Sequence, residues 1–215
     1  MSISKTIVIS CAGVGSRLGF GHTKALLKIA GKPLIIHHLE RLRQFDDVRI
    51  VVGFNAKDLM DVVLSYRKDV IFVFNHNYLT TSTLQSLNSG VAFAQEFIVS
   101  LDGDLLVAPD DLDVFLEEKK EVMGYIKAYS DEPVYTTIEK QGGKNYVTGF
   151  NRKSGNYEWT GLIQIKKNKI TNQGKYVYNA IKNHLPFRAK YINCREIDTP
   201  DDYKKALAWA KNIFK

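Results

Sequence analysis

The sequence has few cysteines and no long apolar run, the features that are typical of disulfide-rich secreted proteins and of membrane-spanning proteins. Its 215 residues include two cysteines, two tryptophans, three methionines and five prolines. Cys11 and Cys194 form no C-x-x-C or Cys/His spacing, which argues against a disulfide framework and a zinc site and favours reduced, buried thiols. The scattered prolines form no linker, and no apolar run approaches the roughly eighteen residues of a membrane helix.

The start of the chain and its charge limit the classes of partner. The first apolar run is short and leads directly into a glycine-rich segment, so we expect no signal peptide, no membrane insertion and a cytoplasmic location. A formal charge of +7 is compatible with nucleic acid, an anionic membrane surface or small anionic substrates. The basic residues are scattered, and the one cluster, Lys166, Lys167 and Lys169, is typical of a solvated turn. We therefore expect no nucleic-acid partner.

Alternating apolar patterns predict an α/β fold. Strands are expected at 5–11, 48–54, 70–75 and 97–101, with helices at 33–45, 55–66 and 83–95 between them. This order is typical of right-handed βαβ crossovers and a mostly parallel sheet. The pattern then changes to a helix at 111–120, strands at 122–129, 134–139, 146–150 and 158–166, and a last helix at 200–213. We predict a single domain, residues 1–215, forming a three-layer sandwich around a mostly parallel mixed sheet.

A glycine-rich loop follows the first predicted strand. Gly13, Gly15 and Gly19 allow the backbone to approach an anion, while Arg17 and Lys24 supply positive charge. A Walker A loop starting at Gly13 or Gly15 would need glycine where Leu18 or Phe20 stands, and a dinucleotide-binding loop starting at Gly13 would need glycine at Leu18. Neither pattern is therefore present. An ordinary flexible loop with solvated basic residues is the alternative from spacing alone.

The segment Thr6–Leu34 resembles the opening motif of nucleotidyltransferases with the glycosyltransferase-A-like, MobA-like fold. In this sequence Cys11 replaces the usual first alanine and Thr23 replaces the proline before the lysine. Both are small, so we expect the loop geometry to survive. The motif matches at Cys11, Ala12, Gly13, Gly15, Ser16, Arg17, Leu18, Lys24, Leu27, Ile29, Gly31, Lys32 and Pro33.

This resemblance implies a Rossmann-like nucleotidyltransferase fold and a set of roles. Residues 1–108 would form the nucleotide-binding half, and 109–215 the acceptor-binding half with a closing helix. Arg17 and Lys24 would be catalytic, since they neutralise charge on the phosphates. The nucleotide would contact Ala12, Gly13, Gly15, Ser16, Arg17, Gly53, Ser82, Ser86 and Asp102.

Two acidic segments predict a magnesium site. Asp102 and Asp104 flank a glycine where the strand at 97–101 ends, and ligands of open parallel sheets bind at such ends. Near the last helix, Thr199 and Pro200 suit helix capping, which leaves Glu196 and Asp198 unexplained. The resemblance implies that Asp198 completes the Mg²⁺ site with Asp104. We expect Glu196 to point away from this site, where it could support the metal ligands through hydrogen bonds, and the sequence leaves open whether it contacts the metal.

The implied reaction is the transfer of a nucleotidyl group to a phosphorylated or phosphonate small molecule, with release of pyrophosphate. The chain looks most similar to small cytidylyltransferases that activate phosphocholine or phosphonate head groups for surface polymers or lipids, which favours CTP. Tyr157, Glu158 and Trp159 are the candidate acceptor site, because two aromatics beside a carboxylate could hold an ammonium group. A core aromatic pair is the other interpretation.

Two further enzyme classes stay open. A sugar-1-phosphate nucleotidyltransferase would use the same loop and metal pair with another acceptor. A nucleotide-sugar glycosyltransferase also carries Asp-x-Asp, but it releases no pyrophosphate. The sequence also leaves open whether the chain forms a homodimer.

Overall fold

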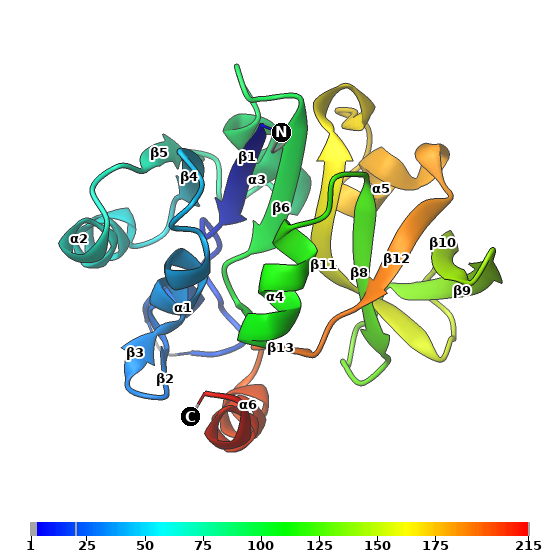
Figure 1. Cartoon of the computed structure of the whole chain (residues 1–215). Coiled ribbons are helices and arrows are strands. Elements are labelled where there is room, and N and C mark those ends of the chain that lie inside the picture. Colours follow the sequence, from blue (N-terminus) through cyan, green and yellow to red (C-terminus); the bar gives the residue numbers. More distant parts are fainter. Residues whose placement is uncertain (1–3, 20, 215) are drawn as a thin grey trace.

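The computed structural model describes residues 4–19 and 21–214. Its described residues form a central nine-stranded mixed sheet (Figure 1). The four strands at one side run parallel to one another, and the other five are mostly antiparallel. Across the sheet the order is β5 (Ile71–Phe74), β4 (Asp47–Val52), β1 (Lys5–Ser10), β6 (Phe97–Asp102), β11 (Tyr157–Lys166), β8 (Val122–Lys127), β12 (Phe187–Tyr191), β10 (Lys144–Asn151) and β9 (Tyr135–Gln141).

Helices cover both faces of the parallel part. On one face lie α1 (Leu34–Arg41), α2 (Ala56–Tyr66) and α4 (Pro109–Leu116), and on the other α3 (Thr83–Gly90) and α5 (Val177–Ile181). Strand β1 shows the cause, because Ile7 and Ile9 enter the first core while Val8 enters the second. Successive side chains of a strand point to opposite faces. The predicted three-layer α/β fold with a mixed sheet is therefore confirmed.

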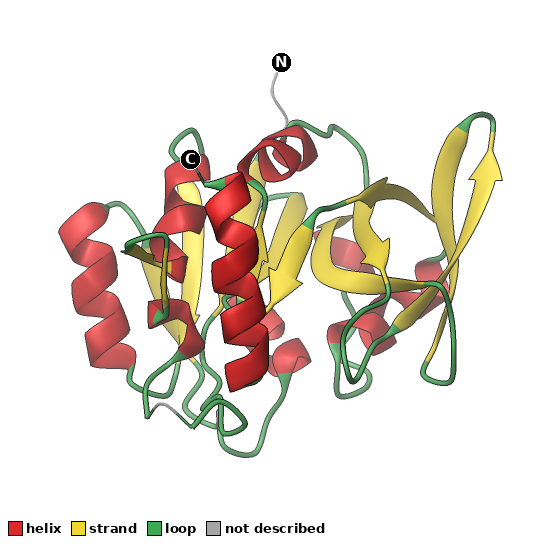
Figure 2. Cartoon of the chain, turned by 90° about the horizontal axis from the view of Figure 1, so that it is seen from below, coloured by secondary structure: helices red, strands yellow, loops and turns green. Residues whose placement is uncertain are grey.

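The later strands curl into a closed ring. Strand β11 pairs with β6, with β8 and, at its first residues, also with β9. The ladder therefore runs from β11 through β8, β12, β10 and β9 and returns to β11. Figure 2 shows this ring as a separate curved group of strands beside the layered part. The predicted mixed extension is thus a small barrel-like unit that shares β11 with the main sheet.

Short elements complete the chain. The sequence patterns did not predict them, because two to five residues show no clear period. They are η1 (Lys24–Leu26), β2 (Lys28–Ile29), β3 (Lys32–Pro33), β7 (Leu105–Val107), η2 (Lys167–Lys169), η3 (Lys182–His184) and β13 (Cys194–Glu196), to which α5 and β12 are added.

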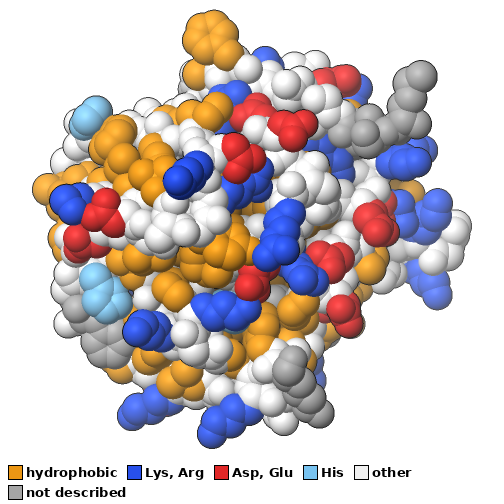
Figure 3. All heavy atoms as spheres, turned by 60° about the vertical axis from the view of Figure 1, so that its left-hand side comes forward, with side chains coloured by type: hydrophobic (Ala, Val, Ile, Leu, Met, Phe, Trp, Pro, Cys, Tyr) orange, Lys and Arg blue, Asp and Glu red, His pale blue; other side chains and the backbone are white. Residues whose placement is uncertain are grey.

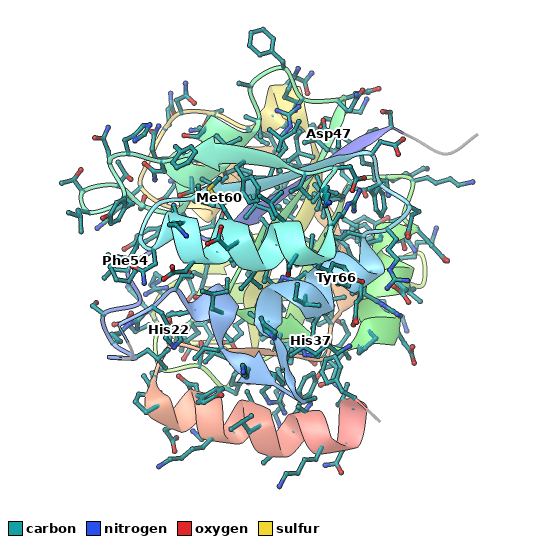
Figure 4. The ribbon with its side chains drawn as sticks, turned by 90° about the vertical axis from the view of Figure 1, so that its left-hand side faces the viewer. His22, His37, Asp47, Phe54, Met60 and Tyr66 are labelled. Carbon is teal, nitrogen blue, oxygen red and sulfur yellow. The ribbon has the colours of Figure 1, made fainter. Side chains whose placement is uncertain are left out.

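The last helix, α6 (Pro200–Ile213), has the predicted bounds. Thr199 and Asp202 form a capping box, with the Asp202 backbone N–H donating to Thr199 Oγ1 at 3.2 Å. The apolar side of α6 packs in a third core with β2 and Leu34 of α1. In Figure 4 this helix runs below α1 and α2, with His37 between. The ring of His37 lies edge-on to Phe214 with centroids 4.6 Å apart.

Three helices differ from their predicted ends. Helix α1 ends at Arg41 rather than at 45, and α4 spans Pro109–Leu116 rather than 111–120. Helix α3 ends at Gly90 rather than at 95, because Phe93 adopts a φ of +54°, which no right-handed helix allows. Gly90 itself packs closely on β1, where a Cβ would come within 2.5 Å of Val8 Cγ1. None of the helices in the described part of the chain is both long and apolar enough to span a membrane.

Candidate active site

The glycine-rich loop lies at the carboxyl edge of the parallel strands. Cys11 continues from β1, its backbone N–H donating to Val51 O at 2.9 Å, and Leu18 anchors the loop in the core with 3% of its surface exposed. Gly15 and Gly19 have φ of +63° and +72°, which glycine adopts without strain. Figure 4 shows His22, from the end of this loop, at the same edge as Phe54, which follows β4.

Thr23, which replaces the expected proline, supports the predicted loop geometry. Its hydroxyl donates to Cys11 O at 3.3 Å, and its side chain is buried. The 3₁₀ turn η1 begins at the next residue, so Lys24 leaves the loop from a fixed position. Its stem passes over the glycine loop, because a Cβ on Gly15 would lie 3.1 Å from Lys24 Cγ.

A cavity of about 430 Å³ opens in front of the loop. Its wall contains Ala12, Gly13 and Arg17 from the loop, together with Ser82 and Ser86 from the start of α3, as predicted. Gly15, Ser16 and Gly53 lie outside this wall. Gly53 is close beneath it, since a Cβ there would lie 2.7 Å from Ala12 O. Asn75, Tyr78, Thr81 and Thr83 also line the cavity, although they were not among the predicted site residues.

The polar side chains in the part of the cavity wall next to α3 form hydrogen bonds with one another. Asn75 is buried and donates from Nδ2 to Thr81 Oγ1 at 3.0 Å and to Ser86 Oγ at 3.2 Å. Ser82 Oγ donates to the carbonyl of Lys175, which links α3 to the segment before α5. This side of the cavity therefore presents an ordered set of amide and hydroxyl groups.

Acidic residues from two distant segments meet on the cavity floor. Strands β7 and β13 pair antiparallel, and the Ile197 backbone N–H donates to Asp104 O at 3.1 Å. One carboxylate oxygen each of Asp104, Glu196 and Asp198 lies within 4.8 Å of the others. Glu196 and Asp198 are two positions apart, and strand alternation places such side chains on the same side, so the argument that Glu196 should point away was mistaken. Glu196 was thus wrongly set apart from the cluster.

Burial and mutual repulsion change the protonation of this cluster. Burial first, and then the charge of Asp104, raise the pKa of Asp102 to about 7. The side chain of Glu196 is open to the cavity, yet protein atoms surround it, so burial and the charges of Asp104 and Asp198 raise its pKa well above the ordinary value. A group of carboxylates this close together requires a compensating cation.

Two basic residues of the loop supply part of that compensation. Lys24 Nζ lies 2.9 Å from Asp104 Oδ2 and also pairs with Asp198. Arg17 spans the cavity mouth, with Nη2 3.0 Å from Asp198 Oδ2 and Nη1 3.2 Å from Glu132 Oε2. The two predicted catalytic residues and the two predicted metal ligands are therefore brought together.

The acidic cluster fits a divalent metal ion. It offers only carboxylate oxygens, which are the ligands that Mg²⁺ prefers, and they come from rigid positions at strand ends. Its pairing with the ammonium of Lys24 shows that it accommodates positive charge. Asp104, Asp198 and Glu196 are the residues that would hold the ion.

The predicted acceptor residues are not brought together. Trp159 lines the cavity, but Tyr157 packs edge-on against Tyr125, with ring centroids 5.4 Å apart. Glu158 is 4% exposed and accepts a hydrogen bond from Ser130 Oγ at 2.6 Å, so its carboxylate holds the 129–130 loop. The residues that join Trp159 in this part of the wall are Glu132, Arg152, Tyr176 and Tyr178.

Among the described residues, no second group of histidine, cysteine and acidic side chains has the spacing to hold a metal ion. On the face in Figure 3, basic, acidic and apolar side chains are interspersed rather than gathered by type. Of the Lys166, Lys167 and Lys169 cluster, Lys166 pairs with Glu96 at 2.9 Å and Lys169 with Glu121 at 2.5 Å.

A family model agrees with this geometry. The model described as "MobA-like NTP transferase domain" matches residues 7–141, which include the glycine loop and Asp104.

Several curated proteins also match the chain. The bifunctional protein GlmU of Methanococcus vannielii is 27% identical over 217 residues, covering 95% of this chain and 48% of its own. The chain thus spans about half, or less, of the first curated relatives that it matches.

Solved structures show the same fold. The CTP:phosphocholine cytidylyltransferase LicC of Streptococcus pneumoniae is 19% identical, with a TM-score of 0.74 and coverage of 96% of this chain and 99% of its own. A UDP-glucose pyrophosphorylase in complex with UDP-glucose is 16% identical, with a TM-score of 0.78 and coverage of 98% and 99%.

Proposed function

The chain belongs to the MobA-like NTP transferase family, and from this membership we propose that it transfers a nucleotidyl group, CMP from CTP in preference, to a phosphorylated or phosphonate small molecule. The observation that carries the proposal is one cavity that joins the glycine loop, Lys24, the three clustered carboxylates and an aromatic wall. Activated head groups of this kind would serve the synthesis of surface polymers or lipids.

The loop side of the cavity supports triphosphate binding. Backbone N–H groups around Gly13 and the guanidinium of Arg17 would hold the phosphates, and Lys24 would neutralise charge that grows on the α-phosphoryl oxygens. A divalent ion held by Asp104, Asp198 and Glu196 would add electrostatic stabilisation of the phosphates. The half formed by residues 1–108 would thus hold the nucleotide.

In the reaction an acceptor phosphate or phosphonate oxygen attacks the α-phosphorus in line. One P–O bond forms, the bond to the β-phosphate breaks, and pyrophosphate leaves with its electron pair. No general base is needed, because a phosphomonoester already carries about −1.5 to −2 charge at pH 7. The residues of the cavity have only to align the two anions and offset their repulsion.

The wall formed from residues 109–215 supports an acceptor that bears an amine. Phe150 contacts both Trp159 and Tyr178, with ring centroids 5.9 Å apart in each pair, so it supports both rings. Glu132 lines the same region with 69% of its side chain exposed. Aromatic faces beside a carboxylate attract an ammonium group. In this proposal Glu132 and Tyr178 therefore replace Glu158 and Tyr157, the acceptor residues predicted from the sequence.

CTP is preferred because a CTP-dependent phosphocholine enzyme is among the similar structures. The second candidate is a sugar-1-phosphate nucleotidyltransferase, which the UDP-glucose pyrophosphorylase structure favours. Arg152 and Ser130 in the wall could donate hydrogen bonds to sugar hydroxyls. A glycosyltransferase remains the third, and it would make no pyrophosphate.

The test is pyrophosphate release in the presence of Mg²⁺. CTP, UTP, ATP and GTP are each combined with phosphocholine, 2-aminoethylphosphonate and several sugar 1-phosphates, with Asp104→Ala as the inactive control. We expect release that requires CTP and an amine-bearing acceptor. Release only with sugar 1-phosphates would move the assignment to the second candidate, and no release from any pair would contradict the proposal.

A further inference from the structure

Lys24 is the most tightly held cation of the acidic cluster. Its side chain is 13% exposed, and its ammonium contacts Asp104 and Asp198, whose side chains are 24% and 21% exposed. The ammonium is therefore paired with two carboxylates at once.

The ammonium uses residues that a divalent ion would need. Asp104 and Asp198 are two of the three residues whose oxygens lie within 4.8 Å of one another. Mg²⁺ requires short, nearly octahedral contacts with oxygen. An ammonium that donates to these two carboxylates blocks part of that shell and repels a second cation.

A nucleotide phosphate bound on the glycine-rich loop would offer Lys24 another partner. The Lys24 side chain lies against Gly15, since a Cβ on Gly15 would be only 3.4 Å from Lys24 Cε. The Lys24 ammonium can therefore reach an anion bound on the loop. A rotation of the last side-chain bonds would exchange carboxylate for phosphate and leave η1 in place. Arg17 would make the same exchange, because it also pairs with Asp198.

We propose that the Lys24 ammonium and a divalent metal ion compete for Asp104 and Asp198, so that the metal binds tightly only when nucleotide phosphates take Lys24 away. This rests on the proposed function for the nucleotide, whereas the competition itself involves only residues of the chain. The site would admit metal together with its substrate and would bind free metal ions weakly.

The experiment measures Mn²⁺ affinity by electron paramagnetic resonance, without nucleotide or acceptor. Removing the competing charge in Lys24→Met should tighten Mn²⁺ binding about tenfold or more. Lys28→Met, at an exposed position on β2, is the matched control and should bind as the unchanged protein does. Equal affinities of Lys24→Met and the unchanged protein, or loss of binding in Lys24→Met, would overturn the proposal.

A second measurement needs no variant that could fail to fold. Lys24 in the unchanged protein is labelled with an acetylating reagent, and its modification is read by mass spectrometry. Saturating Mn²⁺ should increase the labelling of Lys24 severalfold while Lys28 stays constant, and unchanged labelling of Lys24 would reject the competition. Tighter Mn²⁺ binding in Lys24→Met, together with no pyrophosphate release by the unchanged protein from any substrate pair, would reject the proposed function and leave the competition standing.

Discussion

Gly161 lies directly against the carboxylate of Asp102. A Cβ at position 161 would come within 2.5 Å of Asp102 Oδ2, and Gly161 has a φ of +82°. The contact joins β6 to β11 in the stretch of β11 where its pairing with β8 shifts register, and both Gly161 and Asp102 line the cavity. The absence of a side chain at Gly161 thus allows β11 to lie this close to the Asp102 carboxylate.

Gly161→Ala should damage both stability and activity. The strained φ alone costs about 1–3 kcal/mol, and the added methyl must also displace Asp102. Gly143→Ala is the matched control, because Gly143 has a φ of +77° with open space around it. We expect similar losses in urea unfolding but a fall in kcat/KM for Gly161→Ala alone. Equal activity of the two variants would contradict a role for this contact.

The carboxylate cluster can be tested residue by residue. Asp104→Asn and Asp198→Asn should each lower pyrophosphate release at least about a hundredfold, since charge at a reacting phosphate is a large part of catalysis. Glu196→Gln should have a smaller effect that excess Mg²⁺ partly restores. Asp201→Asn, an exposed residue in the first turn of α6, serves as the control and should remain active. Full activity of Asp198→Asn would remove it from the metal site.

Trp159 and Tyr157 should differ in their effect on the KM for the acceptor. Trp159→Ala should raise the KM for an amine-bearing acceptor about 2- to 30-fold, which corresponds to roughly 0.5–2 kcal/mol. Tyr157→Ala should leave that KM nearly unchanged, because its ring packs on Tyr125. Steady-state kinetics with varied acceptor at saturating nucleotide makes the comparison. The reverse result would restore Tyr157 as the acceptor residue.

Glu158 should act through the loop that it holds. Its carboxylate accepts from Ser130 Oγ and from the backbone N–H groups of Tyr129 and Ser130, both 3.3 Å from Oε1. Glu158→Gln should lower stability by about 1–3 kcal/mol, because a buried charge-assisted network loses an acceptor. Unfolding in urea measures this loss, with Glu139→Gln on the exposed end of β9 as control. A change in acceptor KM with unaltered stability would instead favour direct binding.

Acid should destabilise the protein through His38. This ring is 1% exposed and donates from Nε2 to Leu105 O at 2.7 Å, and burial lowers its pKa to about 4. As pH falls, the unfolded chain takes up the proton near 6.5 and the folded protein only near 4. The stabilisation is complete above pH 6.5 and is lost toward pH 4, by up to about 3 kcal/mol.

Urea unfolding between pH 7 and 4 measures this dependence. His38→Gln should flatten it, whereas His76→Gln, at an exposed position, should not. An unchanged slope for His38→Gln would show that other groups cause the acid sensitivity.

Local patterns were sufficient where a residue's role depends on its neighbours in sequence. The β1 run, the glycines after it and the start of the last helix at Thr199 and Pro200 were all predicted, because strand, turn and helix-cap preferences are local. The same holds for Asp104, which comes shortly after the periodic strand β6. Boundaries failed where packing intervened, as at Gly90 against Val8.

The sequence by itself determined the α/β alternation, the glycine-rich loop after the first strand and the acidic segments at strand ends. Only the tertiary structure decided that β7 pairs with β13 and so carries Glu196 to Asp104, that Glu158 turns to Ser130, and that Glu132 and Tyr178 face the cavity beside Trp159. Pairing between short strands about ninety positions apart leaves no periodic trace, because its energy comes from contacts between segments rather than within them.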